Sequence, residues 1–173
     1  MTRAALVLIV VAVIALVLVL MRRGWVSRAR QQGQIVAPPP VPAALLSSGA
    51  GRNAGGYAGR YLGTTVEGDW LGRVVVHDLG VPSSASVSVF AEGLRIHRPQ
   101  SASFFIPTPA LQAVRLDNAA CGKAYGPGGV VVVTWSLGTQ TLDTAIRLDD
   151  VRTHSKLVAD IQPMCAAKEG AVQ

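Results

Sequence analysis

The pattern of apolar and polar residues divides the chain into three parts. Residues 4–21 form an apolar run without charge, glycine, proline or hydroxyl groups. Residues 31–56 are rich in glutamine, proline, alanine, serine and glycine, with one charge. From residue 57 onward, short apolar runs alternate with turn-forming residues at roughly 8–12-residue intervals, a pattern typical of an antiparallel β domain.

The apolar run predicts a helix that crosses a membrane. At about 1.5 Å per residue, the segment from Ala4 to Met21 is roughly 27 Å long, close to the thickness of a bilayer's hydrocarbon core. Trp25 follows at the expected depth of the lipid headgroups, where tryptophan is favoured. A cleaved signal peptide is the alternative, but the run is longer than a usual signal core and no small-residue cleavage site follows it. We expect residues 1–25 to form a transmembrane anchor.

Arginine placement predicts the orientation of this anchor. Arg22, Arg23, Arg28 and Arg30 follow the run, whereas Arg3 alone precedes it. By the positive-inside rule, the side richer in arginine remains in the cytoplasm. We therefore expect a single-pass protein of the plasma membrane with its domain on the cytoplasmic side. The four arginines and Trp25 are candidate membrane-surface residues, because arginine also attracts anionic headgroups.

Residues 26–56 are predicted to be a basic juxtamembrane segment followed by a disordered linker. The prolines at 38–40 and 42 favour stiff polyproline II geometry, and the glycine- and serine-rich part is flexible. A flexible coil of 26 residues reaches about 30 Å. The proline run is also a candidate ligand for a polyproline-reading partner, although a plain spacer is the commoner role. Residues 166–173 are expected to be a disordered tail.

The segment 57–165 is predicted to hold seven short strands and one helix. Residues 66–72 are expected to form a turn, and 111–116 are of undecided type. Asp149 or Asp150 can cap the helix, in which apolar residues recur at helical spacing. We expect a mainly β, partly open barrel of seven strands with the helix covering one end. The strands are expected at residues 57–65, 73–78, 85–90, 94–98, 101–106, 130–137 and 140–148.

Four phrases in this segment carry a resemblance: YLGTT (61–65), GDWLGRVVVH (68–77), VVVVTWSLG (130–138) and LDTAIR (142–147). They are similar to a family of actinobacterial membrane proteins that combine one N-terminal span with a pleckstrin-homology-like (PH-like) domain. The resemblance covers about residues 57–162. It implies the fold and the topology rather than a chemistry, because the family is largely uncharacterised. Some relatives carry export or transporter labels, which a single span does not support.

The charge of the chain lies mainly outside the predicted domain. The formal net charge is +6. Residues 1–56 hold six arginines and no acidic residue, whereas residues 57–173 hold ten basic and ten acidic residues. A nucleic-acid-binding domain needs an excess of basic residues. We therefore expect no nucleic-acid partner.

Candidate catalytic and metal-binding residues do not form a recognisable set. His77, His97 and His154 lack the spacing of a zinc site. His77 and Asp78, as neighbours on a predicted strand, would point to opposite faces. Cys121 and Cys165 have no accompanying histidine motif and are expected to be reduced in the cytoplasm. We expect no enzyme activity, no cofactor and no metal.

The predicted turn at 66–72 holds the candidate contact residues of the domain. PH domains that read phosphoinositides carry basic residues around the corresponding loop, whereas this turn offers Glu67 and Asp69. That departure argues against inositide binding. Trp70 and Leu71 are candidate contacts with a partner or the bilayer. The alternative is that Trp70 folds back over the end of the barrel.

The expected function is a membrane-tethered, non-catalytic interaction module that scaffolds a cytoplasmic protein or peptide at the inner membrane. The partner would bind in a groove between a sheet edge and the C-terminal helix. The first alternative is a sensor of anionic lipid surfaces that uses the juxtamembrane arginines. The second is an unrecognised enzyme or an accessory subunit of a transport or export complex.

Overall fold

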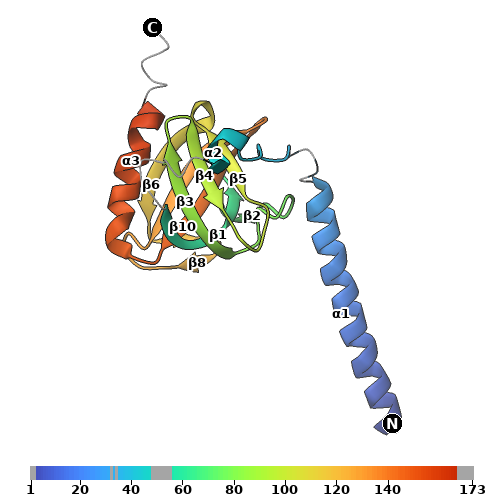
Figure 1. The fold of residues 1–173 in the computed structure, drawn as a ribbon. Helices are drawn as coiled ribbons and strands as arrows, with labels where there is room; N and C mark the ends of the chain where they lie inside the picture. The colour runs from blue at the N-terminus through green and yellow to red at the C-terminus, as the bar shows by residue number, and fades with distance from the viewer. Residues whose placement is uncertain (1–2, 32, 34, 48–55, 167–173) are drawn as a thin grey trace. The chain divides into compact units, whose positions relative to one another are not determined.

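The computed structural model describes residues 3–31, 33, 35–47 and 56–166, in two compact units (Figure 1). The first unit, residues 1–34, contains helix α1 (Arg3–Gln31). Its side chains are described from Val7 to Arg23, and the large apolar ones are 48–70% exposed. Among the described residues, no helix combines the length and the apolarity that a bilayer crossing requires.

The second unit is a curved antiparallel sheet. Its strand order is β5-β4-β3-β1-β10-β9-β6, with β2 paired to β1 and β7 paired to β8 in a separate hairpin. The sheet does not close, so β5 and β6 are its two edges. The strands are β1 (Tyr57–Val66), β2 (Asp69–Arg73), β3 (Ser83–Phe90), β4 (Gly93–His97), β5 (Phe104–Pro107), β6 (Leu111–Asp117), β7 (Ala119–Ala120), β8 (Lys123–Ala124), β9 (Val130–Leu137) and β10 (Gln140–Leu148).

A C-terminal helix covers one opening of this barrel. Helix α3 (His154–Ala166) follows the 3₁₀ turn η2 (Val151–Thr153) and packs along β6. The Asp150 carboxylate accepts a hydrogen bond from the Arg152 N–H and caps η2, as the sequence predicts. A second 3₁₀ turn, η1 (Thr108–Ala110), joins β5 to β6. The predicted mainly β fold with a C-terminal helix is therefore confirmed.

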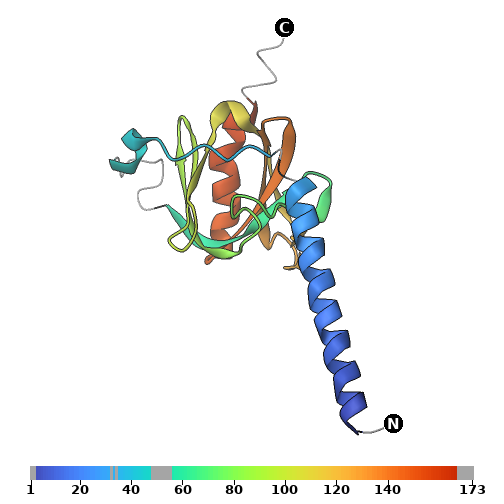
Figure 2. The same cartoon turned by 90° about the vertical axis from the view of Figure 1, so that its right-hand side faces the viewer.

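The opposite opening is covered by a segment that the sequence pattern predicts to be disordered. We call residues 35–45 the strap; it runs into the short helix α2 (Ala43–Ser47). Figures 1 and 2 show the strap and α3 at opposite openings of the barrel. The side chain of Ile35 is 7% exposed and joins the hydrophobic core. One buried aliphatic side chain stabilises such a segment by about 1.5–3 kcal/mol, which offsets part of the entropy of ordering it.

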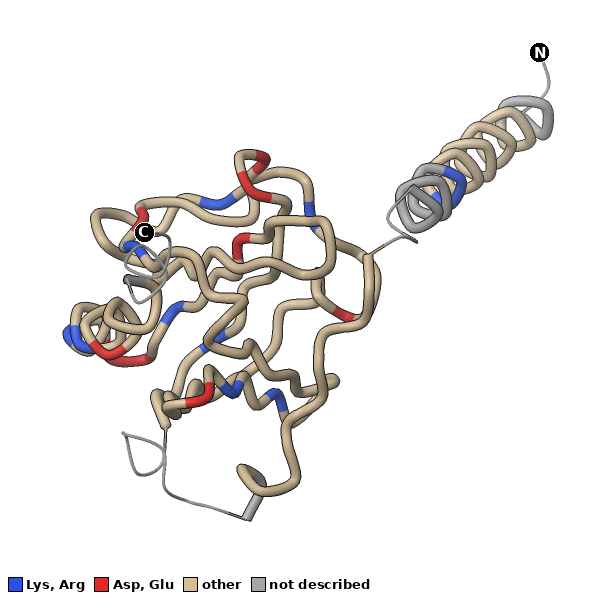
Figure 3. Tube along the Cα trace, turned by 90° about the horizontal axis from the view of Figure 1, so that it is seen from above, with Lys and Arg blue, Asp and Glu red and all other residues tan. Residues whose placement is uncertain are grey.

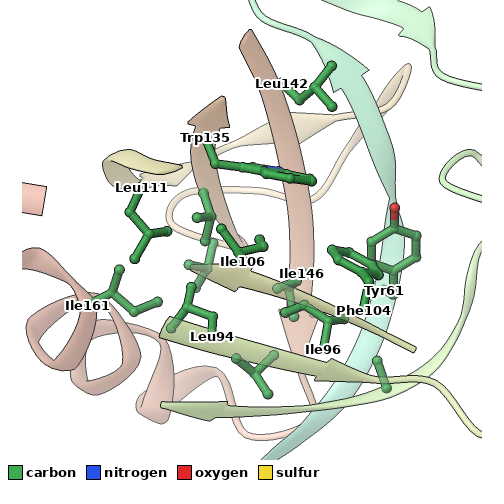
Figure 4. Close-up of a cluster of buried hydrophobic side chains, with 14 of the residues drawn as sticks. Tyr61, Leu94, Ile96, Phe104, Ile106, Leu111, Trp135, Leu142, Ile146 and Ile161 are labelled. Carbon is green, nitrogen blue, oxygen red and sulfur yellow. The ribbon is translucent and has the colours of Figure 1, made fainter. Parts of the chain in front are cut away.

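The core is built around three aromatic rings (Figure 4). The Phe104 ring meets Tyr61 edge-on and stacks on Trp135, with centroid distances of 6.0 Å in both pairs. Trp135 is fully buried. A smaller apolar cluster holds Leu62, Ala120, Cys121, Val130, Val132 and Ala145.

The predicted strand at 73–78 is wrong. Strand β2 ends at Arg73, and His77 and Asp78 adopt left-handed φ angles of 55° and 58°. The chain turns here because Leu79 is inserted into the core, where its carbonyl accepts bonds from the Thr64 N–H and the Tyr61 hydroxyl. Core burial of Leu79 therefore outweighs the strand propensity of the three preceding valines. The segment of undecided type at 111–116 is part of strand β6.

Candidate interaction site

The edge strand β5 already binds an extended segment of its own chain. The Phe105 N–H points away from β4 and donates a hydrogen bond of 2.9 Å to the Pro39 carbonyl of the strap. This is the type of bond by which an added peptide strand binds the edge of a sheet. Residues 38–40 are prolines without an N–H, so the strap can accept hydrogen bonds at these positions but cannot donate them.

Both ends of the strap are anchored through carbonyl groups. The Ile35 carbonyl lies 2.9 Å from Nε2 of His77, and because a carbonyl only accepts, this nitrogen carries the proton. At the other end, Nη1 of Arg95 donates to the Leu45 carbonyl at 3.1 Å. In each of these contacts, as at Phe105, the strap contributes an acceptor and the barrel a donor.

A pocket of about 300 Å³ lies between the strap and the barrel. The strap contributes Ala37, Pro38 and Pro40 to its lining, and the barrel contributes residues 77–78 and 102–104. The wall is mostly apolar, with polar groups from His77, Asp78 and Ser103. This volume is at the lower end of the range for ligand-binding pockets.

A buried arginine joins the two barrel walls of this pocket. Arg98 is 1% exposed, and its Nη1 donates to the Asp78 carbonyl at 2.8 Å. Its Nε donates to the Ala102 carbonyl at 2.9 Å, and Nη2 donates to the same oxygen. The guanidinium lies over the Tyr61 and Phe104 rings, 4.7 and 5.2 Å from their centroids. Burial lowers the pKa of Arg98, while nearby Tyr61 and Asp78 oppose this shift.

Arg98 therefore positions the pocket rather than lining it. Its hydrogen bonds hold the turn at 77–78 and the segment at 102–104 in a fixed relation. The left-handed conformation of His77 and Asp78 costs energy for residues other than glycine. Bonds to a buried guanidinium and the burial of Leu79 maintain that conformation.

The predicted contact residues Trp70 and Leu71 lie on the surface, at the start of β2. They are 52% and 61% exposed, so Trp70 does not fold back to become buried. The predicted turn at 66–72 is wrong beyond Gly68, because strand β2 begins at Asp69. The Asp69 carboxylate stabilises the start of this strand, accepting bonds from the N–H groups of Leu71 (3.1 Å) and Gly72 (2.9 Å). Their contact with a partner or bilayer stays a prediction.

A polar network lies beside Trp70, around a cleft of about 40 Å³. Oδ1 of Asp143 accepts a bond of 2.6 Å from the Thr134 hydroxyl, and Oδ2 accepts one of 2.7 Å from Nη2 of Arg115. The hydrogen bond to Asp143 is the largest cause of the raised pKa of Arg115. Because the carboxylate is already paired with a cation and a hydroxyl, we assign this network a structural role.

The predicted membrane-surface residues fall on α1. Arg22 and Arg23 are exposed on this helix, whereas the side chains of Trp25, Arg28 and Arg30 lie outside the described residues. On the second unit, acidic and basic residues are interspersed along the chain, as Figure 3 shows. The two surfaces thus differ in charge: arginines on α1, and a mixed population on the barrel.

The two cysteines and His154 lie in surroundings that indicate structural roles. Cys121 and Cys165 are free thiols, and burial raises the pKa of both. His154 is buried; its Nε2 accepts from the Leu148 N–H at 3.0 Å, and its Nδ1 lies 2.9 Å from the Gly128 carbonyl. Within the described part of the chain, no three histidine, cysteine or acidic residues gather closely enough to hold a metal ion.

The strap and its pocket are the part of the site that the sequence interpretation missed. The available signal was the apolar residues on both sides of the prolines, Ile35 and Val36 before them and Leu45 and Leu46 after them. A flexible spacer does not need such residues. The predicted groove between a sheet edge and the C-terminal helix differs from the observed pocket, which lies at the β5 edge, whereas α3 packs along β6.

These features define the class of the domain: an open antiparallel barrel with a C-terminal helix over one end is a PH-like fold. The chain belongs to the bacterial PH domain-like family, whose model matches residues 36–162. That match begins inside the strap, so most of the strap lies in the matched region. No curated protein matches the chain.

Proposed function

We propose that the protein is a membrane-tethered, non-catalytic interaction module that holds a protein or peptide partner at the cytoplasmic face of the membrane. The observation that carries the proposal is the β5 edge, where the Phe105 N–H binds an extended segment next to a pocket of about 300 Å³. PH-like domains are generally non-catalytic, which agrees with this role. The edge and pocket offer main-chain bonds and an apolar cavity, the two elements of peptide recognition by strand addition.

Support for the tether comes from the composition of α1. The helix runs from Arg3 to Gln31 and includes the uncharged segment from Ala4 to Met21. Its described large apolar side chains, from Val7 to Met21, are exposed in the isolated chain. A helix that is apolar all round is stable when lipid or protein surrounds it. The arginines that follow the segment favour the cytoplasmic side for the domain.

Cell fractionation with a topology reporter tests the tether. The full chain with a reporter after Gln173 is expected in the membrane fraction, with the reporter active only in the cytoplasm. The variant Val13→Arg places a charge at the centre of the apolar run, at a cost of about 2.5–3.5 kcal/mol for insertion, and is expected to lower the membrane-bound fraction. Recovery of the wild-type chain in the soluble fraction, or a reporter active only outside, would contradict the proposal.

Site-specific cross-linking tests the partner. A photoreactive residue in place of Ala102, which is exposed on the pocket wall, is expected to capture a discrete partner in cells. The same residue in place of Lys156, exposed on α3, is the matched control. Equal cross-linking from both positions would show that the pocket has no special partner.

A sensor of anionic lipid surfaces is the second candidate, favoured by the exposure of Trp70 and Leu71. The test uses the full chain with Trp25→Phe in vesicles that contain brominated anionic lipid. The buried Trp135 is shielded in the core, so lipid contact of Trp70 is expected to appear as quenching of tryptophan fluorescence that disappears in a further Trp70→Phe variant. Quenching that is the same with and without Trp70 would eliminate this candidate.

A further inference from the structure

We infer that the β5 edge is a binding site for an extended, apolar, proline-containing segment of a partner protein, and that the strap is an internal occupant which this segment displaces. The inference rests on the proposed function and names the partner class and the regulation of the same site. The seated strap shows the chemistry that the site accepts: backbone carbonyls facing barrel donors, and an aliphatic side chain in the core.

Three barrel donors define the polar part of this recognition. They are the Phe105 N–H, Nε2 of His77 and Nη1 of Arg95, and all three reach carbonyl oxygens of the strap. Backbone carbonyls are present in every peptide, so these donors select an extended conformation rather than a sequence. A polyproline II segment is already extended and loses little conformational entropy on binding.

The apolar part supplies selectivity. Ile35 fills a buried site in the core, and the strap to which it belongs crosses the opening of the barrel opposite α3. A competing segment must place an aliphatic side chain there, because an empty site leaves a cavity at the end of the core. The adjacent pocket, bounded by Phe104 and Ala102, can take a further apolar side chain that the strap itself does not provide.

The strap is an incomplete ligand for a sheet edge. An added strand normally donates as well as accepts, but Pro38, Pro39 and Pro40 have no N–H to offer. A partner segment with a non-proline residue among these positions adds a donor that the strap lacks. The Phe105 carbonyl faces the same edge as the Phe105 N–H and is the acceptor for such a donor. One hydrogen bond contributes about 0.5–1.5 kcal/mol, so this segment is expected to bind about fivefold more tightly than the strap sequence.

A purely protective role is the competing interpretation. Proteins often cover exposed sheet edges with prolines or loops to prevent aggregation. A protective cover would leave no site at the edge for a free peptide, whereas a displaceable occupant would give way to one. Because the strap belongs to the same chain, it competes with a free peptide at a local concentration of about one millimolar. The test therefore weakens the strap before the peptide is added.

The experiment uses the full chain in lipid nanodiscs and a synthetic peptide with the sequence of residues 35–45. In Ile35→Ser the strap loses its buried anchor, and in His77→Gly the barrel loses the donor to the Ile35 carbonyl while the core side chains remain. Val36→Ser, at an exposed neighbouring position, is the matched control. The readouts are peptide affinity and the exchange rate of the Phe105 amide measured by NMR.

In both weakened variants, we expect Phe105 exchange to accelerate about tenfold or more, and the added peptide to restore protection. The peptide should bind Ile35→Ser about tenfold or more tightly than it binds the wild-type or Val36→Ser chain, because it no longer competes with a fully anchored strap. In His77→Gly no such gain is expected, because the barrel has lost a donor that the peptide and the strap both use. A peptide with serine at the first position should not bind, and one with valine in place of the second of its three consecutive prolines should bind about fivefold more tightly.

Failure of the peptide to bind either weakened variant would overturn the inference and leave the strap as a protective cover. Binding that leaves Phe105 exchange unchanged would also overturn it, because the peptide would then occupy another surface. Neither result depends on where the chain resides in the cell. A failure here is therefore distinguishable from a failure of the proposed tether or of partner capture at Ala102.

Discussion

The guanidinium of Arg98 lies 4.7 Å from the centroid of the Tyr61 ring, inside the domain, and its hydrogen bonds go to main-chain carbonyls. Buried charges are usually paired with an opposite charge. Here carbonyl dipoles and two aromatic faces stabilise the cation, and the arginine connects two loops that line the pocket. Arg98 is therefore expected to influence both stability and the shape of the pocket.

Replacing Arg98 should strongly destabilise the domain. Arg98→Ala is expected to lower the free energy of unfolding by about 3 kcal/mol or more, because several bonds to a charged group are lost. Arg98→Lys keeps the charge but not the planar fork, and should cost about 2 kcal/mol. Urea denaturation followed by circular dichroism measures both, with the exposed Arg152→Ala as the control. An Arg98→Lys protein as stable as the wild type would show that the fork geometry is unimportant.

The strap should contribute measurably to the stability of the barrel. Ile35→Ala removes most of a buried side chain from the core and is expected to cost about 2–3 kcal/mol. Val36→Ala, at the exposed neighbouring position, should change the free energy of unfolding by less than about 0.5 kcal/mol. Equal, small effects of the two substitutions in urea denaturation would mean that the strap is not docked in solution.

Alkaline pH should unfold the domain through its tyrosines. Burial raises the pKa of Tyr57 and Tyr61 well above the usual value of 10.0, and the Asp160 carboxylate adds to the shift at Tyr57, whose hydroxyl lies 2.6 Å from it. The neutral phenols are favoured in the folded state, so this stabilisation is complete below about pH 10 and is lost as the pH rises further.

Denaturation midpoints measured at about pH 8 and about pH 11 test whether stability falls as the pH rises. The wild type should lose stability between the two values, and Tyr57→Phe, which cannot ionise, should lose less. The same substitution also removes the bond to Asp160. At the lower pH, the free energy of unfolding of Tyr57→Phe is therefore expected to be about 1 kcal/mol below that of the wild type. An identical alkaline decline in both proteins would contradict the assignment to Tyr57.

Both thiols should react slowly in the folded protein. Burial raises the pKa of Cys121 and Cys165, which lowers the fraction of reactive thiolate at neutral pH. In Cys165→Ser, the remaining Cys121 is buried and should react with a disulfide reagent much more slowly than in urea-unfolded protein. In Cys121→Ser, the half-buried Cys165 should react at an intermediate rate. Rapid labelling of native Cys121 would mean that its surroundings open readily.

The elements with strong local signals could be predicted from the sequence. The strict alternation at 85–90, the valine-rich run at 130–137 and the helical spacing after Asp150 all correspond to observed elements, β3, β9 and α3. In each case the residues that face the core recur with the period of the element, so burial and local preference agree.

Two segments that were predicted wrongly depend on contacts between residues distant in the sequence. Val74, Val75 and Val76 have high strand propensity, but the chain must turn at His77 and Asp78 to bury Leu79 under Tyr61. Apart from the apolar residues on both sides of its prolines, the strap has the composition of a spacer, and the docking of Ile35 in the core shows that it is part of the domain. Neither the left-handed turn nor the docking site is visible in a local pattern.

Docking of Ile35 also shortens the part of the chain that is left to act as a linker. Helix α1 ends at Gln31, so only residues 32–34 separate it from the first docked residue. Fully extended, that connection spans at most about 14 Å, roughly half of the coil length expected for a 26-residue linker. A ligand that frees the strap would therefore also return its residues to the linker, and would lengthen the tether that we propose for the domain.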